Sequence, residues 1–138
     1  MVEEKNRFQD VVRATVADNG NAFLYNVVLH YWTNTFGTSD FSVRFLSVMF
    51  ALVSVLLVFQ LTSRLTCNET VSLTAAALFA LHPLMIGIAQ INRTNSMTTM
   101  LGIVSTILLV ELLSHEKRLR LRYAAYGLVT GLAFLGHY

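Results

Sequence analysis

Four long apolar blocks divide the chain, and each is almost free of charged residues. None alternates apolar and polar positions as a half-buried strand does, and each is longer than a typical strand. A helix needs about 20 residues to cross the roughly 30 Å hydrocarbon core of a bilayer. The pattern therefore predicts an all-α fold, a multi-pass transmembrane helix bundle of about four spans, at residues 44–62, 71–91, 97–114 and 123–138.

A shorter amphipathic segment precedes the first block. Within residues 21–33, NAFLYNVVLHYWT, the apolar positions 23, 24, 27, 28, 31 and 32 recur at helical spacing and share one face. The segment is too short to span a bilayer, and its tyrosines and tryptophan, Tyr25, Tyr31 and Trp32, suit the headgroup level. We expect a helix that lies in the membrane interface.

The run from Phe36 to Ser39 is predicted to end this interfacial helix, because it contains Gly37 and small polar residues. Ser39 or Asp40 can then cap the helix that enters the membrane. Residues 1–42 are accordingly assigned to a loop outside the membrane and residues 43–138 to the transmembrane region.

Composition supports lipid as the surrounding solvent. Of the 138 residues, 54% are hydrophobic and 13% are charged, whereas soluble domains carry about 25% charged residues. The formal net charge of +2 is too small to indicate a nucleic-acid partner. The single cysteine, Cys67, excludes a disulfide within the chain.

The basic residues predict the orientation. Short loops on the cytoplasmic side of membrane proteins are rich in Lys and Arg. The links at 63–70 and 115–122 contain five such residues, against two, Arg44 and Arg93, near the opposite side. We therefore expect loop 115–122 in the cytoplasm and the N-terminal loop outside, in the inner or plasma membrane of the cell. Both ends look cut, so the segment is expected to be part of a larger transmembrane domain.

Several other polar residues within the blocks are interpreted structurally. His82–Pro83 falls inside the second block, where proline is expected to bend the helix. Glu111 is expected at the cytoplasmic interface, near Lys117 and Arg118. The four histidines are too widely spaced to predict a metal site.

The order of motifs resembles a family of membrane glycosyltransferases. The chain reads DNGNAFLYNVVLHYW, FGTSDFSVRFLS, LFALHPLMIGIAQINR and finally GHY. This order is similar to that of the GT-C superfold, particularly the protein mannosyltransferases and the lipid A aminoarabinose transferases. The sequence departs from the family at Asn21–Ala22–Phe23, where two prolines are usual, and at Asn95, where tyrosine often follows the arginine.

The resemblance implies an inverting transfer of a sugar from a polyprenyl-phosphate donor to an acceptor on the outer face. Such chemistry needs a base for the acceptor hydroxyl and cations for the departing phosphate. By resemblance, Glu3 or Glu4 is the base, and the donor phosphate is bound by a set of outer-face residues, namely Arg44, Arg93, His137 and Tyr138. The resemblance leaves open the sugar, the acceptor and the help of a divalent cation.

Each of these residues also has a structural interpretation. Glu3 and Glu4 can belong to a solvated terminus, while Arg44 and Arg93 can anchor helices at the lipid headgroups. The alternative to an enzyme is therefore a non-catalytic multi-pass protein, such as a transporter fragment or an assembly subunit. The clustering of charge at one face, rather than at the midplane, favours the transferase. The segment alone is expected to be inactive.

Overall fold

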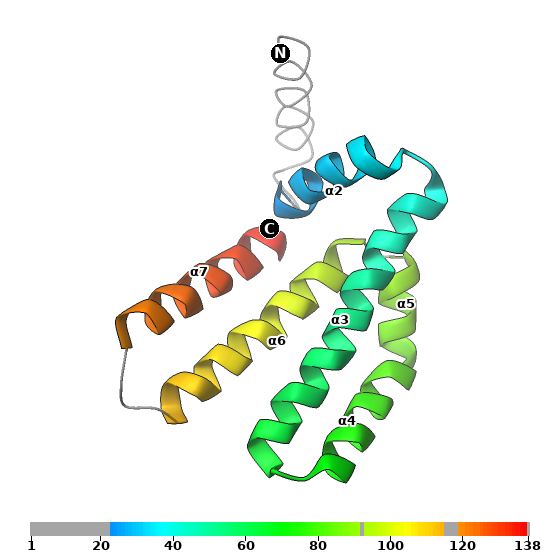
Figure 1. The fold of residues 1–138 in the computed structure, drawn as a ribbon. Helices are drawn as coiled ribbons and strands as arrows, with labels where there is room; N and C mark the ends of the chain where they lie inside the picture. The colour runs from blue at the N-terminus through cyan, green and yellow to red at the C-terminus, as the bar shows by residue number, and fades with distance from the viewer. Residues whose placement is uncertain (1–22, 92, 115–118, 138) are drawn as a thin grey trace.

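The computed structural model describes residues 23–91, 93–114 and 119–137, and within these ranges every regular element is an α-helix. Figure 1 shows α3 (Asp40–Thr66), α6 (Arg93–Ser114) and α7 (Leu119–His137) running side by side in alternating directions. The pair α4 (Glu69–Leu81) and α5 (Pro83–Ile91) lies on the other side of α3. The helix α2 (Phe23–Phe36) lies across one end of this layer. The predicted all-α fold is confirmed.

Among the described residues, the two helices α3 and α6 are long and apolar enough to cross a membrane. With a rise of about 1.5 Å per residue, helices of 27 and 22 residues exceed or match a core of about 30 Å. Large apolar side chains on these helices remain exposed in the isolated chain, among them Leu52, Leu56 and Leu113. Contiguous exposed apolar surface of this kind fits lipid or further protein rather than water.

The helix boundaries extend beyond the apolar blocks because capping residues, not hydrophobicity, end a helix. The first span is predicted at 44–62, but α3 begins at Asp40, where the Ser39 hydroxyl accepts a hydrogen bond from the Ser42 amide at 3.2 Å. It ends at Thr66, since Cys67 adopts a left-handed conformation with a φ of 52°. The side chain of Asn68 then caps α4.

Pro83 turns the predicted bend in the second span into a complete break. Its nitrogen has no hydrogen to donate, so the regular helix stops at Leu81. The Leu84 amide donates to Nδ1 of His82 at 3.2 Å, and the Met85 amide donates to the His82 carbonyl at 2.9 Å. These bonds start α5 in a new direction, with Pro83 at the first helical position, where proline is well tolerated.

Small hydroxyl side chains are buried where the helices meet. Ser47 and Ser54 on α3 and Ser72 on α4 are at most 1% exposed. Between α6 and α7, the hydroxyls of Ser105 and Thr130 are hydrogen-bonded at 2.7 Å. Small residues let helix backbones approach closely, and hydroxyl pairs of this kind stabilise helix contacts inside membranes.

Candidate functional site

The helix directions bring three predicted site residues to the same end of the bundle. Arg44 lies in the second turn of α3, Arg93 is the first residue of α6 and His137 is the last residue of α7. The start of α3, the start of α6 and the end of α7 all face the end of the bundle that α2 crosses, with α6 between α3 and α7 (Figure 1). We call this end, defined by Arg44, Arg93 and His137, the α2 end.

Three further predicted site residues, Glu3, Glu4 and Tyr138, lie outside the described residues. Their roles therefore stay predictions from the resemblance.

The corner between α2 and α3 fixes the position of Arg44. Gly37 has a φ of +85°, a left-handed conformation that glycine adopts without strain, and it lets the chain reverse between the two helices. Nε1 of Trp32 donates to both the carbonyl and the hydroxyl oxygen of Ser42, each at 3.1 Å. The first turn of α3 is thus tied to α2, and Arg44 follows two residues later.

The buried face of α2 differs from the predicted one. Tyr25 is only 3% exposed and forms a core cluster with Leu46 of α3 and Met97 of α6. Its hydroxyl contacts the Ser47 hydroxyl at 3.4 Å. Tyr31, which we assigned to the apolar face, is 61% exposed. The predicted face is therefore wrong by about one residue, because two adjacent apolar stripes run along this helix and the sequence does not reveal which one packs.

The Arg44 side chain is exposed, and within the described ranges it forms no ion pair. Its guanidinium is therefore available to a ligand at the α2 end. A guanidinium presents a fork of N–H donors that fits the oxygens of a phosphate.

An aromatic hollow of about 290 Å³ opens at the corner of α2 and α3, lined by side chains from the end of α2 and the first two turns of α3. The rings of Trp32 and Phe36 are stacked with centroids 4.2 Å apart, and Phe41 and Phe45 are stacked at 6.1 Å. The sequence predicts Trp32 on the apolar face of an interfacial helix, but it does not predict this hollow. The four-residue spacing of Phe41 and Phe45 is the sequence feature that could have indicated this hollow, because it places both rings on one side of α3.

The opposite end of the bundle holds an ion pair. Arg64, near the end of α3, pairs with Glu111 of α6. We predicted Glu111 at the interface near Lys117 and Arg118, which lie outside the described residues, but did not identify Arg64 as its partner. Both side chains are about one-third exposed, so the pair contributes modestly to stability. It joins the two longest helices at the end remote from Arg44.

Within the described ranges, no three His, Cys, Asp or Glu side chains lie close enough to hold a metal ion. Glu3 and Glu4 lie outside these ranges.

Comparison with known proteins shows the family of the chain. Residues 21–138 match the family model described as dolichyl-phosphate-mannose-protein mannosyltransferase. The chain belongs to this family. Its members are membrane-integral glycosyltransferases, so the predicted resemblance is confirmed and the exposed apolar helices have an explanation.

A curated relative supports the same family. The chain is 34% identical over 111 residues to the undecaprenyl phosphate-alpha-4-amino-4-deoxy-L-arabinose arabinosyl transferase of Pectobacterium atrosepticum. The match covers 77% of this chain but 20% of that protein, so the chain spans about a fifth of its relative's length. No solved structure matches the chain.

Proposed function

We propose that this chain forms part of an inverting glycosyltransferase that moves a sugar from a polyprenyl-phosphate donor to an acceptor on the outer face of the cell membrane. Family membership supports glycosyl transfer. The name of the relative includes undecaprenyl phosphate, which supports a lipid-linked donor. The segment alone is inactive in this proposal, since the match covers 20% of the relative.

One observation supports particular residues as the donor site. Arg44, Arg93 and His137 lie at the same end of the bundle. They come from three different helices and are separated by up to 93 positions in the sequence, from 44 to 137. Cations at one membrane face suit a ligand whose phosphate lies at the headgroup level and whose tail lies in lipid.

The proposed reaction is a single displacement at the anomeric carbon of the sugar. The acceptor hydroxyl attacks this carbon while its bond to the phosphate oxygen breaks, so the configuration inverts and polyprenyl phosphate leaves. A carboxylate, Glu3 or Glu4, takes the hydroxyl proton. Arg44 and Arg93, with His137 and Tyr138, stabilise the charge that grows on the departing phosphate.

The proposal includes four membrane crossings, with residues 1–42 outside and loop 115–122 in the cytoplasm. The second crossing would be made by α4, with 13 residues, followed by α5, with 9 residues. The fourth crossing would be made by α7, with 19 residues. Each extends about 30 Å at 1.5 Å per residue, although the break shortens the pair. These lengths support the second and fourth crossings.

Binding of the reaction product tests the donor class. We expect polyprenyl phosphate to raise the thermal unfolding midpoint of the purified natural polypeptide at its full length, because ligands that bind only the folded state stabilise it. Polyprenol without phosphate and inorganic phosphate without a lipid tail are the matched controls. An equal shift with polyprenol, or no shift with polyprenyl phosphate, would contradict a site for a lipid-linked phosphate.

A further inference from the structure

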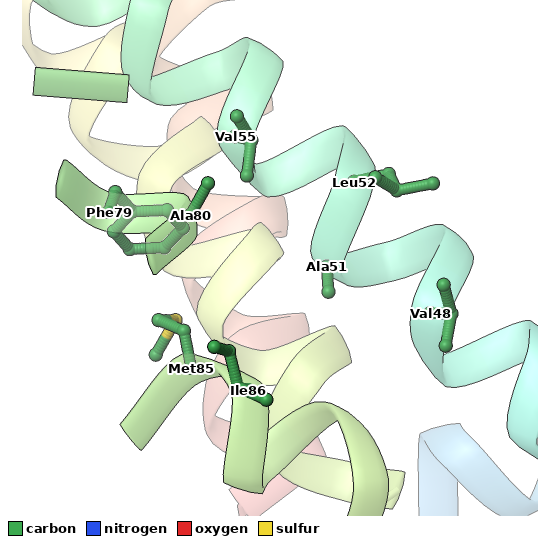
Figure 2. A pocket seen from close by; sticks show the side chains of 8 residues that line it. All are labelled: Val48, Ala51, Leu52, Val55, Phe79, Ala80, Met85 and Ile86. Atoms are coloured by element: carbon green, nitrogen blue, oxygen red, sulfur yellow. The ribbon is translucent and has the colours of Figure 1, made fainter. Parts of the chain in front are cut away.

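A groove of about 240 Å³ runs along α3, beside the break between α4 and α5. Figure 2 shows its two walls, one from α3 and one from the flanks of the break, and its lining is almost entirely apolar. The lining residues are Val48, Ala51, Leu52 and Val55 on α3, Phe79 and Ala80 on α4, and Met85 and Ile86 on α5.

The α3 wall of the groove continues the helix face that carries Arg44. Val48 and Leu52 lie one and two turns beyond Arg44 at spacings of four residues, and Ala51 and Val55 fill the same stripe. At about 1.5 Å per residue, the groove begins about 6 Å from Arg44 and extends to about 16 Å. The exposed Arg44 therefore lies at the α2 end of the apolar groove, which runs along α3.

We infer that this groove binds the first isoprene units of the polyprenyl chain of the donor, whose phosphate lies at Arg44. The inference rests on the proposed function and assigns the lipid tail to particular side chains. A polyprenyl phosphate has the same layout as the stripe, with an anion at one end and a branched hydrocarbon beyond it. The Pro83 break provides the space, because it turns α5 in a new direction and leaves a recess beside α3.

Exposure of the groove wall agrees with a site that a lipid enters sideways. Leu52 is 56% exposed, Ile86 is 46% exposed and Val48 is 38% exposed, although all three lie within long apolar segments. A hydrocarbon chain in the groove would cover these side chains. Burial of apolar surface then supplies binding energy that the phosphate contact alone does not.

Donors of two chain lengths test this inference on the natural full-length polypeptide in vesicles. A long-chain polyprenyl-phosphate sugar reaches the groove, whereas a donor shortened to one isoprene unit does not extend past its mouth. In Ala51→Trp the indole fills the groove, so we expect the KM for the long-chain donor to rise about tenfold and the KM for the short-chain donor to stay unchanged. Ala124→Trp, at an exposed position on α7, is the matched control.

A second variant covers the case in which Ala51→Trp fails to fold. Leu52→Ala removes an exposed wall side chain without opening a cavity in the core, and we expect it to raise the long-chain KM about fivefold with no change for the short-chain donor. Equal effects on both donors, or none on either, would overturn the inference and leave the groove to bilayer lipid or another helix. A wild-type protein that uses neither donor would instead contradict the proposed function, on which the inference rests.

Discussion

Replacement of Arg93 by alanine is expected to lower the rate of sugar transfer about 10²- to 10³-fold in the natural full-length polypeptide. Removal of a single donor that stabilises developing negative charge has an effect of this size in other enzymes. Arg93 is the first residue of α6, at the end of the bundle that also carries Arg44 and His137. The measurement is the initial rate of transfer from a polyprenyl-phosphate sugar at saturating donor.

The variant Arg93→Lys distinguishes two roles of this arginine, namely binding of the donor phosphate and anchoring of α6 at the lipid headgroups. Lysine keeps the charge and can reach the lipid headgroups equally well, but it lacks the planar fork that binds two phosphate oxygens. We expect Arg93→Lys to remain well below the wild-type rate. Arg120→Ala, an exposed position in the first turn of α7 at the opposite end, is the control that should retain activity. If Arg93→Lys matched the wild type, the arginine would be an anchor rather than a ligand of the donor.

Loss of the catalytic base is expected to have an equally large effect. Glu3→Gln and Glu4→Gln preserve side-chain size and remove the carboxylate, and loss of a general base typically lowers a rate about 10²- to 10⁴-fold. We expect one of the two single variants to show nearly the whole loss seen in the double variant, because a single carboxylate takes the proton. The measurement is the transfer rate at saturating donor and acceptor.

Asp40→Asn provides the matched control for these carboxylates. Asp40 lies in the first turn of α3, beside the same bundle end, but the resemblance assigns it no part in proton transfer. Its loss should change the rate little. A double variant of Glu3 and Glu4 that transferred sugar as fast as the wild type would remove both residues from the mechanism.

Much of the fold could be predicted from the sequence because lipid imposes a simple rule on the chain. Uncharged blocks of about 20 residues can satisfy their backbone only as helices, and α3 and α6 follow the blocks that predicted them. The boundaries were less accurate, since caps such as Ser39 and Cys67 end helices beyond the apolar residues. Hydropathy does not register these local hydrogen bonds.

Contacts between helices were harder to predict than the helices themselves. Tyr25 was assigned to the lipid headgroup level, yet it lies in the core beside Leu46 and Met97. The Arg64–Glu111 pair joins positions 47 residues apart, a relation that no local pattern encodes. The placement of Arg44, Arg93 and His137 at one end of the bundle was predictable because it requires only the alternating direction of successive spans.

The apolar groove could not have been found from the sequence. Its α3 stripe is visible as a periodic pattern, but its other wall exists only because the chain breaks at Pro83 and resumes in a new direction. A proline inside an apolar block predicts a bend without its direction. The structure was needed to show that the recess lies beside the stripe that begins at Arg44.

The most direct test of the account follows a labelled sugar on polyprenyl phosphate in native membranes, which supply the acceptor, with and without the natural full-length polypeptide. We predict that the label moves to an acceptor only when the polypeptide is present, and that one free polyprenyl phosphate appears for each sugar transferred. An intact lipid-linked donor, or transfer that requires a nucleotide sugar in its place, would contradict the assignment of this chain to a polyprenyl-phosphate-dependent glycosyltransferase.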